Sequence, residues 1–161
     1  MIILGLIGIF VLLILVLQGC RPPQPPPPQP PDLPEDSPKY RALFVGVSKY
    51  DNYQGTMDLP SPAKNAERLR TLFNKFRYTE YNIPFIEIRT LINHDASAQG
   101  ILNAIAETFK DSKENDINFL YYMGHGGTVN GVPMITAADY KASLPSTYIT
   151  VHKLKAEFDK I

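Results

Sequence analysis

Short apolar segments alternate with amphipathic ones over the last three quarters of the chain. The apolar segments 42–47, 84–92 and 117–123 are rich in β-branched and aromatic residues, as strands are. Residues 61–76 and 97–109, which separate them, carry apolar side chains at helical spacing. The order β-α-β-α-β favours right-handed crossovers and a parallel sheet with helices on both faces. We therefore predict an α/β fold, a three-layer sandwich around a parallel sheet.

The helical segments contain signals for their starts and for their buried faces. Ser61 can cap the first helix, with Pro62 at its first position, and the second helix follows from Ser97. A last helix, capped by Thr150, is predicted within residues 147–161. The predicted buried faces are Ala66, Leu69, Leu72, Phe73 and Phe76 in the first helix, Ile101, Leu102, Ile105 and Phe109 in the second, and Leu154, Phe158 and Ile161 in the last.

The strand at residues 117–123 is apolar almost throughout, which predicts a central strand covered on both faces. The last helix ends with the chain at Ile161, whereas a crossover helix ordinarily leads to another strand. We therefore expect the sheet to be incomplete at its C-terminal side.

The first 39 residues differ in composition from the rest. Residues 2–17 contain no charged or strongly polar side chain and as a helix would span about 24 Å, which suits a signal peptide or a short membrane anchor. The "LQGC" that ends this region resembles a bacterial lipobox, so we expect Cys20 to be lipidated; the alternative is a membrane helix that ends at Cys20. Ten of the fifteen prolines lie in residues 22–38, which predicts an extended linker. The expected organisation is a signal peptide with lipobox or a membrane anchor (1–20), a proline-rich linker (21–39) and a folded domain (40–161), held at a membrane outside the cytoplasm.

The composition excludes several kinds of site. Lysine plus arginine and aspartate plus glutamate each number 16, so no basic excess suggests binding to nucleic acid. The single cysteine, Cys20, excludes a disulfide within the chain and a zinc site built from cysteines. No calcium-loop pattern occurs either, and we predict no cofactor.

A histidine between glycines follows the third predicted strand. His125 is expected just past the carboxyl end of this strand, at the edge of a parallel sheet where ligands bind. The glycines at 124, 126 and 127 leave the backbone bare, so an amide there can donate to an oxyanion while the imidazole moves protons. A glycine-rich turn with an exposed histidine is the alternative, and spacing alone does not separate the two.

Five segments of the chain follow one another in an informative order. They are "RALFVGVSKYDN", "LPSPAKNAERLRTLF", "LINHDASAQGILNAI", "ENDINFLYYMGHGG", and "ITAADY" followed by "YITVHKLKAEF". Together they resemble the first part of a caspase-like domain, the domain of caspases, metacaspases and their bacterial relatives in clan CD. The resemblance covers residues 41–161.

The resemblance implies a cysteine endopeptidase that acts on a peptide or protein substrate. It assigns His125 as the catalytic histidine and the N–H of Gly126 as one half of the oxyanion hole. In the family the nucleophilic cysteine ends the next strand, in an Asp-x-Cys-like motif. Cys20 lies in the targeting segment and cannot replace it, so we expect the 161-residue chain alone to be inactive.

The family resemblance also bears on specificity and on calcium. Where metacaspases have a cysteine and an aspartate in the first helix, this chain has Pro62 and Asn65, so an acidic pocket for basic residues is not supported. Where caspases have an arginine that binds aspartate, the chain has Leu59. Calcium dependence is possible only by analogy with metacaspases.

The other titratable residues are predicted to have no chemical role. His94 is expected in a solvated loop, His152 in the first turn of the last helix and Asp139 in a turn. Tyr121 and Tyr122 are expected to pack in the core and at the strand edge.

Two other functions are compatible with the sequence. One is a non-catalytic caspase-like module that binds or regulates a partner. The other is an α/β-hydrolase, in which "HGGT" would be an oxyanion loop, although the Gly-x-Ser-x-Gly elbow of that fold is absent.

Overall fold

The computed structural model describes residues 37–77 and 85–161. The predictions for residues 1–20 and for most of the linker, including lipidation of Cys20, therefore lie outside the described residues. Within the described part of the chain, no helix is long and apolar enough to cross a membrane.

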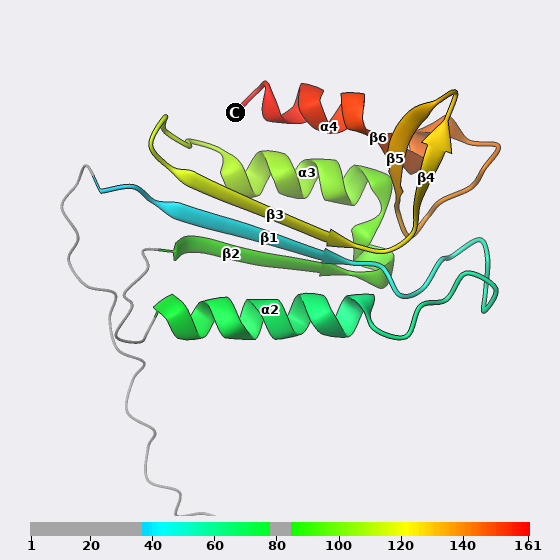
Figure 1. Ribbon diagram of the computed structural model, residues 1–161, viewed down its shortest axis with the longest axis horizontal. Helices are drawn as coiled ribbons and strands as arrows, with labels where there is room; N and C mark the ends of the chain where they lie inside the picture. Colours follow the sequence, from blue (N-terminus) through cyan, green and yellow to red (C-terminus); the bar gives the residue numbers. More distant parts are fainter. Residues whose placement is uncertain (1–36, 78–84) are drawn as a thin grey trace, which may run out of the picture.

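A parallel sheet of three strands forms the middle layer, as predicted (Figure 1). Its strands are β1 (Tyr40–Gly46), β2 (Phe85–Ile92) and β3 (Ile117–Met123), in the order β2-β1-β3. The prediction of a central third strand was wrong for the described sheet, because β1 is central and β3 lies at an edge. Consistent with this position, Ile117 is 48% exposed and Phe119 40% exposed. A continuously apolar strand is expected to be covered on both faces of the sheet. Its own sequence does not show, however, whether it has a neighbouring strand on each side.

Helices cover both faces of the sheet, so the predicted three layers are confirmed (Figure 1). Helix α2 (Pro62–Arg77) lies on one face, and α3 (Ala98–Phe109) lies on the other with α4 (Val151–Phe158) packed outside it. Alternation along β1 divides the core: Ala42 and Phe44 belong to the cluster on the α2 side, whereas Leu43 and Val45 belong to the larger cluster on the α3 side, as does Val47 just after the strand.

The predicted cap at Thr150 forms, and Ser97, predicted as the start of the second helix, caps α3. The Ser97 hydroxyl accepts the Gly100 N–H at 3.1 Å at the start of α3, and the Thr150 hydroxyl accepts the Lys153 N–H at 3.2 Å at the start of α4. The predicted buried face of α2 is only partly correct, because Leu72 is 44% exposed.

A second sheet lies beyond the carboxyl ends of the parallel strands and was not predicted (Figure 1). It is antiparallel, in the order β4-β5-β6, and consists of β4 (Gly126–Val129), β5 (Val132–Thr136) and β6 (Tyr148–Thr150). Asn130 and Gly131, with φ of 51° and 76°, form the two-residue turn of the β4–β5 hairpin. The "VNGV" sequence is a strong hairpin signal that sequence reasoning missed. Two 3₁₀ turns, η1 (Asn93–Ala96) and η2 (Pro145–Thr147), complete the fold.

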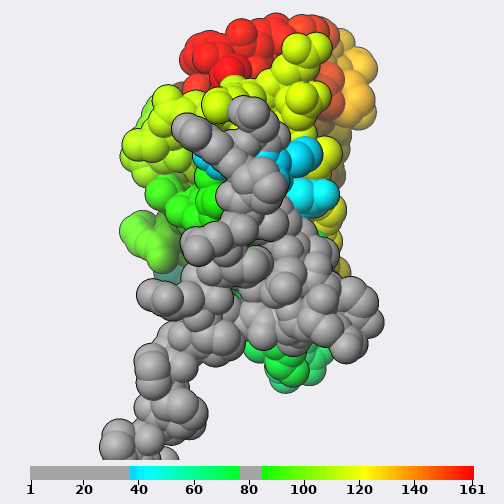
Figure 2. All heavy atoms as spheres, turned by 90° about the vertical axis from the view of Figure 1, so that its left-hand side faces the viewer, coloured from blue at the N-terminus to red at the C-terminus, as the bar shows by residue number. Residues whose placement is uncertain are grey.

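The amino end of the parallel sheet is closed by a buried ion pair. The Asp116 carboxylate accepts three hydrogen bonds: from the Arg41 guanidinium at 2.8 Å, from the Lys39 N–H at 2.9 Å and from the Lys113 N–H at 3.0 Å. The side chains of Arg41 and Asp116 are only 7% and 4% exposed. In the space-filling view of this end, the first described residues (cyan) lie beside the yellow-green residues that precede β3 (Figure 2).

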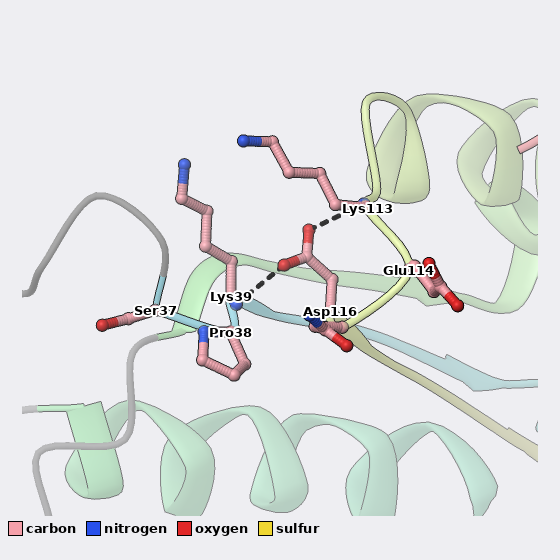
Figure 3. A pocket seen from close by; sticks show the side chains of 7 residues that line it. Ser37, Pro38, Lys39, Lys113, Glu114 and Asp116 are labelled. Atoms are coloured by element: carbon pink, nitrogen blue, oxygen red, sulfur yellow. Dashed lines mark hydrogen bonds between the residues drawn. The ribbon is translucent and has the colours of Figure 1, made fainter.

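A cavity of about 260 Å³ opens beside this ion pair, lined by residues 37–39 and 113–116 (Figure 3). The side chains of Lys39 and Lys113 extend past Asp116, which their backbone N–H groups bind (Figure 3). The carboxylate therefore already has its partners in the fold, and this end of the sheet is an anchor.

Candidate functional site

His125 lies two residues beyond Met123, the last residue of β3, where the sequence predicted it. Its backbone is held by three other elements. The N–H donates to the Tyr50 hydroxyl at 2.7 Å, and the C=O accepts both the Tyr122 hydroxyl at 2.8 Å and the Thr136 N–H at 3.0 Å. The histidine is thus fixed between the loop after β1, the end of β3 and strand β5.

The imidazole is oriented by a backbone carbonyl. His125 Nε2 lies 2.9 Å from the C=O oxygen of Met57, in the loop between β1 and α2. Because a carbonyl oxygen can only accept, Nε2 carries the proton of the neutral ring and Nδ1 keeps its lone pair. The ring of Tyr50 packs against the imidazole, with centroids 5.2 Å apart. The basic nitrogen is therefore Nδ1, and it has no hydrogen-bond partner among the described residues.

Two tyrosines support this histidine without carrying charge. Burial raises the pKa of Tyr50, while hydrogen bonds with the His125 N–H and the Tyr122 hydroxyl act in the opposite direction. Burial also raises the pKa of Tyr122, and the neighbouring Tyr50 raises it further. Tyr122 contacts the Thr136 carbonyl oxygen at 2.8 Å as well as that of His125. Both phenols stay neutral and act as hydrogen-bonding groups.

The glycine before the histidine is required by this packing. A Cβ atom at Gly124 would overlap the Tyr122 hydroxyl and lie 3.0 Å from the Tyr50 hydroxyl. The two tyrosine hydroxyls can approach the backbone this closely only because residue 124 has no side chain.

The N–H of Gly126 faces away from the hairpin. The bond from the Thr136 N–H to the His125 C=O makes these two residues a hydrogen-bonded pair of the antiparallel ladder. Such pairs alternate with non-bonded pairs, and Gly126, opposite Ile135, is the next residue along. Its N–H therefore points to the outer side of β4, and the residue is exposed. A donor without a ladder partner thus lies one residue from the imidazole.

The loop that supplies Tyr50 and Met57 is itself held in place. The Asn93 side-chain oxygen accepts the N–H groups of Ser48 at 3.0 Å and Lys49 at 3.1 Å. Further along the loop, the Asp51 N–H donates to the Ala138 C=O at 2.9 Å. The segment that follows β5 and the turn after β2 therefore fix the carbonyl that orients the histidine.

Two of the residues considered for specificity, Asn65 and Leu59, are hydrogen-bonded near this edge of the sheet. The Asn65 amide lies 3.4 Å from the sulfur of Met123, at the end of β3. The Leu59 N–H donates to the Ser48 C=O at 2.9 Å. Neither residue contributes a charge to the site.

The other titratable residues lie outside the site. The His94 side chain is 88% exposed and contacts Asp51 at 3.1 Å, and His152 is exposed on α4. Asp139 accepts the Ala98 N–H at 2.8 Å at the start of α3. The Tyr121 hydroxyl donates to the sulfur of Met123 at 3.1 Å and forms no other hydrogen bond with the described residues.

Sequence reasoning missed three groups that hold the histidine. Tyr122 was expected only to pack, yet its hydroxyl binds the His125 backbone. Tyr50 could have been considered, because it follows β1 at the same edge of the sheet. Met57 contributes only its carbonyl, and a backbone group leaves no signal in residue identity. Among the described residues, no group of three or more His, Cys, Asp or Glu could hold a metal ion.

A model of a known protein family matches this chain. The caspase-domain model matches residues 39–160, well over half of the chain. The chain therefore belongs to the caspase family, as the resemblance implied. No curated protein matches the sequence.

Proposed function

We propose that this chain provides the histidine half of a cysteine endopeptidase that uses a Cys-His dyad. The observation that carries the proposal is the bond between Nε2 of His125 and the Met57 carbonyl. It leaves Nδ1 as a fixed proton acceptor, which is what a thiol nucleophile needs from its base. Membership of the caspase family supports the same chemistry.

In this mechanism Nδ1 of His125 takes the proton of the thiol, and the thiolate attacks the carbonyl carbon of a peptide bond. The oxyanion that forms accepts the outward-facing N–H of Gly126. The imidazolium then gives its proton to the leaving amine as the C–N bond breaks. Water, deprotonated by the same imidazole, hydrolyses the thioester and regenerates the thiol.

The nucleophile must come from another strand. The only cysteine among the 161 residues is Cys20, which lies outside the described residues. Strand β3 has β1 on one side only in the described sheet, and its other edge is free to pair. We place the catalytic thiol at the end of a strand that pairs with this edge, and we expect the 161 residues alone not to hydrolyse peptides.

A caspase-like module that binds a partner without catalysis is the second candidate function. The observations that favour it are the absence of a cysteine from residues 37–161 and the exposed Ile117 and Phe119 on the edge strand. The caspase-domain match favours either of these proposals over the α/β-hydrolase alternative.

We further propose that residues 1–19 act as a signal peptide and that a lipid on Cys20 anchors the protein outside the cytoplasm. The apolar run and the "LQGC" sequence support this assignment. Radioactive palmitate should label the protein, and Cys20→Ser should abolish the label. Equal labelling of the variant would contradict lipidation at this residue.

The test of catalysis uses the protein together with the proposed cysteine-bearing strand that pairs with β3. His125→Ala should lower kcat/KM for a peptide substrate by about 10²- to 10⁴-fold or more, because the general base is lost. His152→Ala is the matched control, since His152 is exposed on α4, and it should leave the rate unchanged. A cysteine-directed acylating probe should label the protein and a serine-directed probe should not. Unchanged hydrolysis in His125→Ala would reject the proposed role.

A further inference from the structure

The outer edge of β4 is a row of backbone groups that lies directly beside the histidine. Strand β4 pairs with β5 on one side, and its residues Gly126, Gly127 and Thr128 are exposed. An edge strand of this kind offers unpaired N–H and C=O groups to another extended chain.

Two further features agree on which groups of β4 point outward. Pro133 lies directly opposite Thr128, and proline has no N–H to give, so this is a non-bonded pair of the ladder. The two-residue turn Asn130–Gly131 connects Val129 to Val132, and these two residues form a hydrogen-bonded pair of the ladder. The bonded pair at His125 and Thr136 gives the same alternation. The N–H and C=O groups of Gly126 and Thr128 therefore face outward.

Strand β4 lacks the features that protect the edge of a sheet. Its sequence, Gly-Gly-Thr-Val, contains no lysine, no other charge and no proline. By contrast β2, at an edge of the parallel sheet, carries Glu87 and Arg89, which form an ion pair. Two consecutive glycines also leave the backbone of β4 uncovered, which permits close approach of another backbone.

We propose that the outer edge of β4 binds the backbone of the peptide substrate as an added strand. The Gly126 N–H binds the carbonyl of the bond to be cleaved, and Thr128 pairs with the substrate two residues further along. This inference rests on the proposed function, because it uses the same Gly126 donor. It adds a binding surface made of main-chain groups, which accepts many side chains.

The first test measures, in the protein without peptide, which β4 amides are bonded to β5 and which face outward. Amide hydrogen exchange should be fast at Gly126 and Thr128 and slow at Gly127 and Val129, because only the latter two donate within the ladder. Slow exchange at Gly126 and Thr128 would show that these groups are already occupied and would overturn the proposal.

The second test adds a ligand. A mixture of random heptapeptides, acetylated and amidated at their ends, is titrated into ¹⁵N-labelled protein at millimolar concentration. The amide signals of Gly126 and Thr128 should shift more than those of Gly127 and Val129. The same mixture with every peptide nitrogen methylated cannot donate to the β4 carbonyls and should produce no such shift. Equal shifts with both mixtures, or no shift with either, would overturn strand addition.

A pair of variants at one residue isolates the backbone donor. Thr128→Pro removes the outward N–H and should weaken binding by about 2- to 10-fold, the effect of one hydrogen bond. Thr128→Ala keeps that N–H and should bind as the unchanged protein does. Slow exchange of the Thr136 amide reports that the hairpin is intact in each variant. Equal binding by both variants would overturn the proposal.

Two controls separate strand addition from catalysis and from self-association. His125→Ala should still bind the peptides, since the edge does not depend on the imidazole, so binding can succeed even if the proposed catalysis fails. Shifts at Gly126 and Thr128 that depend on protein concentration without peptide would identify a second copy of the chain as the occupant and would contradict the proposal.

Discussion

The two ends of the parallel sheet are held together by different kinds of interaction. At the amino end, a buried carboxylate and a guanidinium, Asp116 and Arg41, form an ion pair that two backbone N–H groups complete. At the carboxyl end, His125 is held by tyrosine hydroxyls and backbone groups, and no charged side chain among the described residues contacts it.

This difference follows from what each end has to do. A buried ion pair fixes the geometry firmly, and it also changes the protonation of any titratable group nearby. Neutral hydroxyls and carbonyls fix the His125 backbone and ring without placing a charged side chain beside the imidazole. The amino end is built as an anchor, and the carboxyl end is built to keep a base available.

The largest effect on stability is expected at the amino end. Arg41→Met keeps most of the side-chain volume but leaves Asp116 buried without its cation, and it should lower the free energy of unfolding by about 3–5 kcal/mol. Arg89→Met is the control, because the Arg89 ion pairs are partly exposed and should contribute less than about 1 kcal/mol. Urea unfolding measures both. Similar losses for the two variants would contradict the role of Asp116 and Arg41 as a buried anchor.

The same pair predicts how stability depends on pH. The hydrogen bond from Arg41, followed by the backbone N–H groups of Lys39 and Lys113, holds the pKa of Asp116 well below its ordinary value. The stabilisation is complete above the unfolded pKa of about 3.9 and is lost as the pH falls through the lower pKa of the folded protein, because the unfolded chain takes up the proton first. Urea midpoints between pH 6 and pH 2 should show this decline, and Asp116→Asn should reduce it. If the urea midpoint of Asp116→Asn fell with pH as steeply as that of the unchanged protein, the acid sensitivity would come from other groups.

A smaller effect is expected at the carboxyl end. Tyr122→Phe removes a hydroxyl that contacts the carbonyl oxygens of His125 and Thr136, and it should cost about 1–2 kcal/mol. The neighbouring Tyr121→Phe removes only a contact with the sulfur of Met123 and should cost less than about 0.5 kcal/mol. Equal losses for the two variants would show that the Tyr122 hydroxyl does not hold the histidine loop.

Features that depend on nearby residues were predictable from the sequence. The caps at Ser97 and Thr150 and the place of His125 after a strand follow from short patterns. The position of β3 at an edge was not predictable from its own residues, because strand order is decided by distant segments. The orienting group of the histidine was hidden for another reason, since the Met57 carbonyl is a backbone atom that any residue could supply.

The central claim is that the Met57 carbonyl holds His125 with Nδ1 as the free base, and ¹⁵N NMR of the imidazole tests it directly. At a pH where the ring is neutral, Nε2 should have the shift of a protonated nitrogen and Nδ1 that of an unprotonated one. The exposed His152 provides the in-chain reference, with averaged shifts from both tautomers. A proton on Nδ1, or averaged shifts at His125 like those of His152, would contradict the account.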